Sequence, residues 1–384
     1  MKADRRKNFP KSIRTAYRVW GALVSLVLCF SMTACGAGDR QPDYTDKLVE
    51  EETQINSQTD APGEDGDGET QGNGRTDAAR EENPDNAAVP GNSGEEQASE
   101  ENDTSEAPVF DLEDGTVMLN SGYEMPILGI GTFCLSGSEA ENSVYWALRD
   151  GYRLIDTARI YENEADVGRG IQRAIDEGIV TREEIFVTTK MWTDDFDNGA
   201  EAVDASLERL GLDYIDLMIL HHSQPRNDVA AYQAMEQAVS EGKLRSIGLS
   251  NYYTPEDLDR LVNAASIVPA LLQNETHPYH QSVEMKEHLQ QYGTVMESWF
   301  PLGGRGNTQT LFDDETISGI AQAHGKTSAQ AILRWHLQAG NIAIPGSSNE
   351  DHIQENFEIF DFELTDEEMR EMTALDRNER FAAY

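Results

Sequence analysis

Residues 154–190 read LIDTARIYENEADVGRGIQRAIDEGIVTREEIFVTTK, and this stretch contains one complete strand–helix–strand unit. A short apolar run at 154–156 is followed by an amphipathic segment at 163–177 and by a second apolar run at 185–189. An amphipathic helix between two short apolar strands is typical of a right-handed βαβ crossover, in which both strands lie parallel in one sheet. The stretch therefore predicts an α/β fold with a parallel sheet.

The same alternation continues through the segment 110–384. This segment has about 275 residues, close to the length of about 250 that is typical of a (β/α)8 TIM barrel. Eight apolar runs are predicted as strands, at 127–131, 154–156, 185–189, 217–220, 246–249, 271–273, 294–298 and 341–344. Amphipathic segments are predicted as helices at 138–150, 163–177, 199–209, 228–240, 255–265, 283–291 and 327–337. Residues 110–384 are therefore predicted to form a (β/α)8 barrel.

Two features near the start of this domain refine the prediction. Residues 117–125 read VMLNSGYEM, the pattern of a β-hairpin with a glycine in its turn, and such a hairpin could cover the bottom of the barrel. The competing architecture, an open doubly wound sheet, requires a glycine-rich phosphate loop after its first strand. Gly129 and Gly131 are not followed by the third glycine of that loop, so the barrel is favoured.

Residues 1–34 have the pattern of a secretory signal peptide. Basic side chains dominate the first half, and the apolar run at 19–30 is shorter than the roughly 20 residues that a membrane-spanning helix needs. The sequence SMTACG at 31–36 resembles the lipobox of bacterial lipoproteins, with Met32 where Leu is usual. The resemblance implies that Cys35 is lipidated and anchors the protein at the extracytoplasmic face of the bacterial cell membrane. The alternative is an uncleaved N-terminal anchor with an incidental Cys35.

Composition separates the segment 35–109 from the rest. Acidic side chains far outnumber basic ones here, and no aromatic residue follows Tyr44. Such a segment buries too little apolar surface to fold, so a disordered acidic linker is predicted. The whole chain has 30 Lys and Arg against 70 Asp and Glu, a formal charge of −40, which argues against nucleic-acid binding. The three cysteines match neither a disulfide framework nor a zinc site, and no metal site is predicted.

Polar residues collect at the predicted strand ends, where TIM-barrel enzymes carry out their chemistry. Asp156 ends the second strand, and Tyr161 follows five residues later. Lys190 follows the third strand and His221 the fourth. An ammonium group stabilises a phenolate, a carboxylate fixes the ammonium, and an imidazole can orient a carbonyl oxygen. Together these groups could protonate a carbonyl while another molecule delivers hydride.

These residues lie in motifs that resemble the aldo-keto reductase superfamily, from about residue 117 to 381. The motifs are GIGTF at 129–133, IDTARIYENE at 155–164, VTTKMW at 187–192, DLMILH at 216–221, IGLSNY at 247–252, QNETHPY at 273–279, ESWFPLG at 297–303 and IPGSS at 344–348. The resemblance implies a barrel that reduces small aldehydes and ketones with NADPH or NADH, or oxidises the alcohols. It implies the catalytic residues Asp156, Tyr161, Lys190 and His221, with Tyr161 as proton donor.

The resemblance also implies the binding residues. Trp299 would stack on the nicotinamide ring, and Ser250, Asn251 and Gln273 would hold its carboxamide. The implied cofactor contacts are Thr132, Ser250, Asn251, Gln273, Trp299, Leu302, Ile344, Ser347, His352, Glu355 and Asn356. The implied substrate contacts are Phe133, Trp192 and His222.

Several positions depart from the family pattern. Gly346 and His352 stand where the family often has a Lys and an Arg that grip the 2′-phosphate of NADPH. Charge-assisted hydrogen bonds are worth roughly 1.5–3 kcal/mol each, so weak discrimination between NADH and NADPH is predicted. Phe133 and His222 replace common tryptophans and predict a less aromatic pocket for small carbonyl substrates. The alternative hypothesis is a non-catalytic cell-surface binding module; no oligomeric state is indicated.

Overall fold

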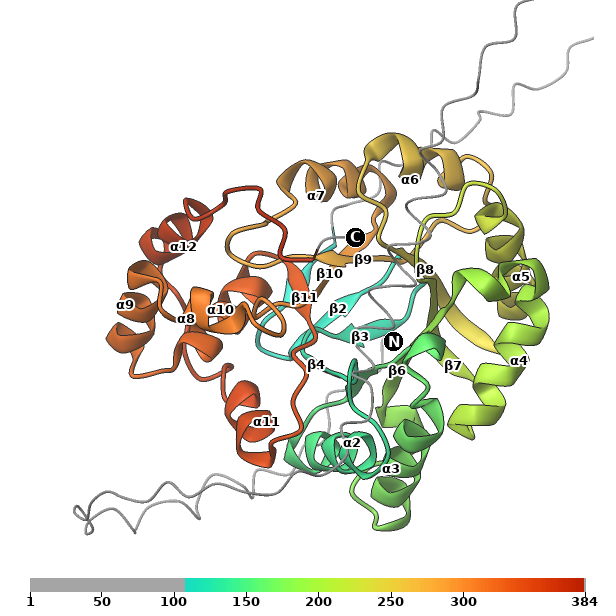
Figure 1. Cartoon of the computed structure of the whole chain (residues 1–384), viewed down its shortest axis with the longest axis horizontal. Helices are drawn as coiled ribbons and strands as arrows, with labels where there is room; N and C mark the ends of the chain where they lie inside the picture. The colour runs from blue at the N-terminus through green and yellow to red at the C-terminus, as the bar shows by residue number, and fades with distance from the viewer. Residues whose placement is uncertain (1–107, 383–384) are drawn as a thin grey trace, which may run out of the picture. The chain divides into compact units, whose positions relative to one another are not determined.

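The computed structural model describes residues 108–382, so Cys35, the predicted signal peptide and almost all of the predicted linker lie outside the described residues. Eight parallel strands follow one another around a single sheet in sequence order (Figure 1). They are β4 Gly129–Gly131, β5 Leu154–Asp156, β6 Phe186–Met191, β7 Ile215–Leu220, β8 Leu244–Ser250, β9 Leu271–Glu275, β10 Val295–Trp299 and β11 Asn341–Ala343. A parallel bridge between Leu128 and Ala343 brings the first strand against the last. The predicted (β/α)8 barrel is confirmed.

Helices surround the strands (Figure 1). Those at predicted positions are α2 Ser138–Asp150, α3 Glu164–Asp176, α4 Gly199–Leu210, α5 Asp228–Ser240, α6 Pro255–Val262, α7 Val283–Leu289 and α10 Ser328–Gln338. Four further helices were not predicted, namely α8 Thr308–Phe312, α9 Glu315–His324, α11 Glu350–Phe357 and α12 Asp366–Thr373. Within 108–382, no helix has the length and apolar character needed to cross a membrane.

The two ends of the sheet meet at two glycines. The Gly131 amide donates to the Pro345 carbonyl at 3.1 Å, which extends the contact between β4 and β11. A β-carbon at Gly131 would lie 2.7 Å from the Ile344 carbonyl oxygen, and one at Gly346 would lie 2.8 Å from the Gly131 carbonyl oxygen. Both distances are below van der Waals contact, so glycine at 131 and 346 permits the barrel to close.

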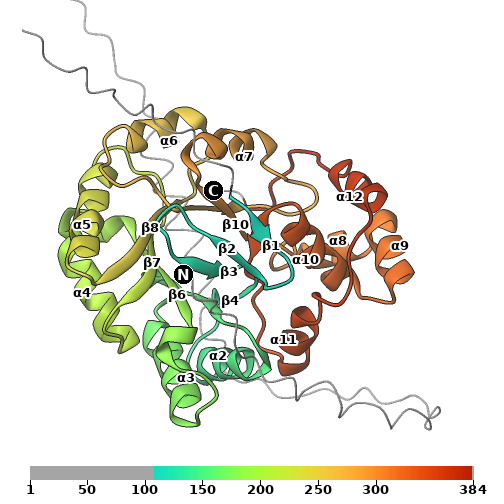
Figure 2. The ribbon, with the colours of Figure 1, turned by 180° about the vertical axis from the view of Figure 1, so that it is seen from behind.

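A small antiparallel sheet lies across the bottom of the barrel, where the parallel strands begin (Figure 2). It contains β1 Phe110–Asp111, β2 Thr116–Met118 and β3 Glu124–Pro126. The pair β2–β3 is the predicted hairpin, and β1 adds a third strand that the sequence analysis did not predict. Val117 and Met125 are register partners and both are buried in the main hydrophobic core, so this sheet seals the barrel bottom.

A buried carboxylate links three barrel strands near the bottom of the barrel. Asp216 in β7 accepts from Arg182 Nη2 at 2.7 Å and from Arg245 Nη1 at 2.8 Å. Its Oδ2 atom also accepts from the Val187 amide of β6 at 3.0 Å. A buried charge is tolerated when it is paired and hydrogen-bonded in this way. The network fixes β6 and β7 relative to β8, and these strands carry functional side chains at their opposite ends.

Candidate active site

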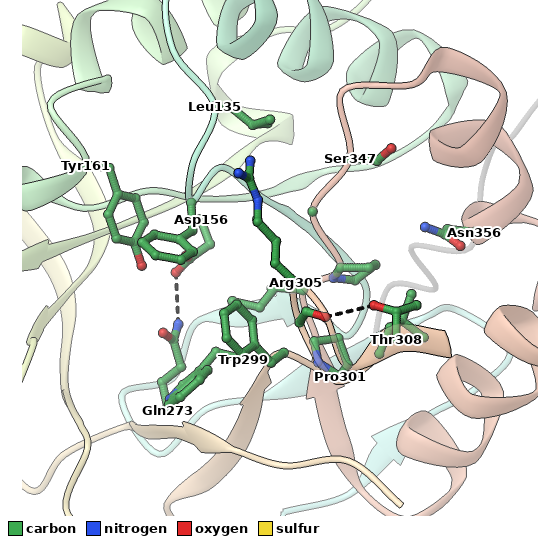
Figure 3. Close-up of a pocket in the computed structure, with 18 of the residues that line it drawn as sticks. Leu135, Asp156, Tyr161, Gln273, Trp299, Pro301, Arg305, Thr308, Ser347 and Asn356 are labelled. Carbon is green, nitrogen blue, oxygen red and sulfur yellow. Dashed lines mark hydrogen bonds between the residues drawn. The ribbon is translucent and has the colours of Figure 1, made fainter. Parts of the chain in front are cut away.

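A cavity of about 610 Å³ opens where the barrel strands end, and Figure 3 shows part of its lining. The last residues of β5, β8 and β10 contribute Asp156, Ser250 and Trp299, and the middle of β9 contributes Gln273. This is the end of a TIM barrel at which active sites form. The predicted site residues that line it are Phe133, Asp156, Tyr161, His221, His222, Ser250, Asn251, Gln273, Trp299, Leu302, Ile344, Ser347, His352, Glu355 and Asn356.

Lys190 lies beneath the cavity floor and is fully buried. Its ammonium donates to Asp156 Oδ1 at 2.5 Å, to the Thr157 carbonyl at 3.0 Å and to the Tyr161 hydroxyl at 3.3 Å. A short 3₁₀ turn, Arg159–Tyr161, follows β5 and brings Tyr161 back over the strand ends. Burial raises the pKa of the Asp156 carboxyl, and the Lys190 ammonium opposes that rise. The structure thus brings these three predicted catalytic residues into direct contact.

His221 completes this group from the end of β7. Its ring meets the Tyr161 ring edge-on, with 5.7 Å between the centroids. Burial, and then the charges of His222 and Lys190, hold the pKa of His221 well below its ordinary value. The imidazole is therefore neutral at neutral pH and carries one N–H. A neutral imidazole beside a tyrosine hydroxyl can hydrogen-bond a carbonyl oxygen without competing for the proton.

Trp299 and Asn251 form the wall next to this centre. Trp299 Nε1 donates to Asn251 Oδ1 at 3.2 Å, and Asn251 Nδ2 donates to the His221 carbonyl at 2.8 Å. Asn251 adopts a left-handed backbone conformation with φ of 60°, which Asn tolerates better than most residues. The Asn251 amide therefore ties the tryptophan to the strand that carries His221.

The far end of the cavity is built by the segment after β11 and by α11. Ser347 and Asn356 lie across the cavity from Asp156 and Tyr161 (Figure 3). Asn349 caps α11, because its Oδ1 atom accepts from the Asp351 and His352 amides. The cavity therefore extends from the predicted catalytic residues to a polar end, and Trp299 offers a ring face between them. These residues fit an elongated dinucleotide with an aromatic ring at one end.

The structure places two predicted contacts outside the lining. Thr132 is fully buried, and its hydroxyl donates to the Asp156 carbonyl at 3.0 Å. Trp192 is 2 % exposed and packs edge-on against His221 and His222, at centroid distances of 5.1 and 5.3 Å. Both residues support the site from behind, Thr132 through Asp156 and Trp192 through the two histidines.

Part of the loop after β10 belongs to the site and was not predicted from the sequence. Phe300, Gly304, Arg305 and Thr308 line the cavity, and Arg305 is the only Lys or Arg among the described residues that line it. Arg305 Nη2 donates to the Cys134 carbonyl at 3.2 Å, so this loop reaches across to the loop after β4. The run GGRG at 303–306 was the available signal, since a lone cation between glycines is well placed to approach an anion. In the described part of the chain, no group of three His, Cys, Asp or Glu side chains could hold a metal ion.

The barrel and this site define a class of protein, an NAD(P)H-dependent oxidoreductase that acts on carbonyl groups. Residues 127–377 match the aldo/keto reductase family, and the chain belongs to that family. The methylglyoxal reductase DkgA of Yersinia pestis is 41% identical over 268 residues, which are 69% of this chain and 94% of the relative. The glyoxal reductase of Bacillus subtilis (strain 168) is 42% identical over 268 residues, with the same coverage of 69% and 94%.

A solved structure shows the same likeness in three dimensions. The Bombyx mori aldo-keto reductase in complex with NADP has 36% sequence identity and a TM-score of 0.65. The match covers 72% of this chain and 95% of that chain. The family membership and the site geometry support an enzyme, and nothing in the comparisons favours the non-catalytic binding module.

Proposed function

We propose that Tyr161 donates the proton in carbonyl reduction, with Lys190, Asp156 and His221 in supporting roles. The observation that carries this proposal is the 3.3 Å contact between the Lys190 ammonium and the Tyr161 hydroxyl. The ammonium stabilises the phenolate that remains after proton transfer. Asp156 holds the ammonium in place, and the neutral His221 imidazole hydrogen-bonds the carbonyl oxygen. A bound reduced nicotinamide supplies the hydride for the carbonyl carbon.

Steady-state kinetics of Tyr161→Phe test this assignment. Removal of the proton donor should lower kcat by about 10²- to 10⁴-fold, the usual contribution of general acid catalysis. Cofactor affinity should stay unchanged, because Tyr161 lies at the end of the cavity where the carbonyl group of the substrate would bind. A variant that keeps the wild-type kcat would refute the assignment.

The cofactor site is proposed to accept NADH and NADPH with little discrimination. Trp299 would stack on the nicotinamide, while Ser347, His352 and Asn356 would meet the adenosine end. Arg305, the only Lys or Arg that lines the cavity within residues 108–382, would approach the pyrophosphate that both cofactors share. Comparison of kcat/KM for the two cofactors tests this proposal. Near-equal values support it, and a preference for NADPH of about a hundredfold contradicts it.

Small vicinal dicarbonyl compounds are the proposed substrates. The relatives include a methylglyoxal reductase and a glyoxal reductase. Phe133 and Phe300 pack together at a centroid distance of 5.9 Å, and Phe133 also meets Tyr161 at 5.1 Å, so apolar rings border the proton donor. A screen of glyoxal, methylglyoxal and diacetyl against bulky aromatic ketones tests the assignment. Faster turnover of the bulky ketones would contradict it.

The location of the protein is a separate proposal that rests on the N-terminal sequence. Residues 1–34 would act as a lipoprotein signal peptide, Cys35 would carry the lipid, and 35–109 would hold the barrel away from the extracytoplasmic face of the membrane. Membrane fractionation and metabolic lipid labelling of Cys35→Ser test this. The variant should lose the label and remain unprocessed. Unchanged labelling and processing would contradict the proposal.

A further inference from the structure

The Gln273 amide lies between two buried carboxyl groups inside the barrel. Gln273 and Glu297 are register partners on the neighbouring strands β9 and β10. The Gln273 Nε2 atom lies 2.9 Å from Asp156 Oδ2, a contact drawn in Figure 3, and 2.7 Å from Glu297 Oε2. The Asp156 carboxylate, which is paired with the Lys190 ammonium, only accepts hydrogen bonds, so the Gln273 atom that faces it and Glu297 is the NH₂ group. Both of its hydrogens are therefore engaged within the protein.

Glu297 is suited to act as a neutral acceptor here. Its side chain is completely buried, and its Oε1 atom has no hydrogen-bond partner among residues 108–382. Burial, reinforced by the Asp156 charge, raises the pKa of Glu297 to about 8. A protonated Glu297 can carry its proton on Oε1 and still accept from Gln273 through Oε2. A second buried negative charge beside Asp156 is thereby avoided.

The oxygen of the Gln273 amide remains available to a ligand. Gln273 lines the cavity, and within the described part of the chain its Oε1 atom accepts no hydrogen bond. Ser250 Oγ accepts from Asn251 Nδ2 at 3.2 Å, so its own proton remains to be donated. The Asn251 amide is already engaged with His221 and Trp299. The cavity thus presents one donor, Ser250, and one acceptor, Gln273, to a carboxamide.

We propose that Glu297 is a positioning residue that fixes the Gln273 amide with its oxygen toward the cavity, so that the site recognises the NH₂ group of the nicotinamide carboxamide. This inference rests on the proposed function, since it requires a nicotinamide cofactor. The same network reaches the proposed proton donor Tyr161. Asp156 accepts hydrogen bonds from Gln273 on Oδ2 and from Lys190 on Oδ1, and Lys190 contacts the Tyr161 hydroxyl. Glu297 therefore links the carboxamide site to the catalytic group without touching either substrate or cofactor.

The test compares NADP⁺ with its 3-acetylpyridine analogue, in which a methyl ketone replaces the carboxamide and no NH₂ group exists. Dissociation constants are measured for the wild-type protein, for Glu297→Gln, which keeps an acceptor oxygen, and for Glu297→Met, which removes it at similar volume. 2′-Phospho-ADP-ribose, which lacks the pyridine ring, serves as the control ligand. The wild-type protein should bind NADP⁺ about three- to tenfold more tightly than the analogue, since one hydrogen bond is lost.

Glu297→Met should lower this ratio, because Asp156 alone then holds the Gln273 amide, while the Kd of 2′-phospho-ADP-ribose stays unchanged. Glu297→Gln should keep the ratio. A full ratio in Glu297→Met, or a wild-type protein that binds both pyridine nucleotides equally, would overturn the inference. If Glu297→Met does not fold, Glu297→Thr replaces it, because a threonine is too short to reach the Gln273 amide. A wild-type protein that binds no NADP⁺ would instead overturn the proposed function.

Discussion

Removal of Lys190 separates the structural role of the buried ion pair from its chemical role. Lys190→Met leaves the Asp156 carboxylate, 2 % exposed, without the ammonium that lies 2.5 Å away. Loss of one partner from a buried ion pair costs about 3–5 kcal/mol, because the other charge stays buried and uncompensated. The free energy of unfolding should therefore fall by about that amount in Lys190→Met.

The double variant Lys190→Met with Asp156→Asn removes the uncompensated charge as well. Asn at 156 keeps an oxygen that can accept from Gln273, so the free energy of unfolding should return to within about 1 kcal/mol of wild type. Activity should not return, since the Tyr161 phenolate still lacks its ammonium. Both variants should therefore lose about 10²- to 10⁴-fold in kcat.

Urea unfolding followed by tryptophan fluorescence gives the stabilities, and initial rates of NADPH oxidation with methylglyoxal give the activities. Lys243→Met is the matched control, because Lys243 pairs with Asp204 at the surface, where an ion pair contributes little. This control should keep both stability and activity. Equal stability of the single and double variants, or recovery of kcat in the double variant, would refute the reasoning.

Three further predictions follow from the site. Arg305→Met should weaken the binding of NADH and of NADPH equally, by about tenfold, as expected for the loss of a charge-assisted hydrogen bond to the shared pyrophosphate. Fluorescence titration measures both affinities. An effect on NADPH alone would place Arg305 at the 2′-phosphate instead. As the pH rises from about 4.5 to 8, the free energy of unfolding of Glu297→Gln should increase relative to that of the wild-type protein. In this range the folded wild-type protein keeps a proton on Glu297 that the unfolded chain releases, so the wild-type protein loses stability. Calorimetric Tm values of the two proteins that change in parallel with pH would contradict this. A His222→Gln variant removes the neighbouring imidazole, so that its pH profile reports on His221. Its kcat/KM should show no ionisation near pH 6.5, because burial holds the pKa of His221 well below that value. A step near pH 6.5 would show that His221 titrates there.

The barrel and the juxtaposition of the proposed catalytic residues could be predicted because both depend on local patterns. Each strand is a short apolar run, and each proposed catalytic residue ends such a run or follows it closely. The helices α9 and α12 carried equally clear signals, the Asp314 cap with Gly325 for α9 and the Thr365–Glu368 capping box for α12. They were missed because the barrel pattern requires one helix after each strand, and these segments are additional.

Contacts between distant strands could not be predicted. Gly346 was interpreted only as a missing cation, whereas a β-carbon there would lie 2.8 Å from the Gly131 carbonyl oxygen. The role of this glycine in closing the barrel depends on how β4 meets β11. Arg305 and the pairing of Gln273 with Glu297 likewise depend on tertiary contacts that connect separate strand ends.

Transfer of deuterium tests the central claim most directly. The protein is given NADPH that carries deuterium at C4 of the nicotinamide, on the transferred face, together with methylglyoxal. The account predicts an alcohol with one deuterium on the former carbonyl carbon, formed in equal amount to the cofactor oxidised, and a rate about 10²- to 10⁴-fold lower for Tyr161→Phe. An alcohol without deuterium, or no turnover although the cofactor binds, would contradict it.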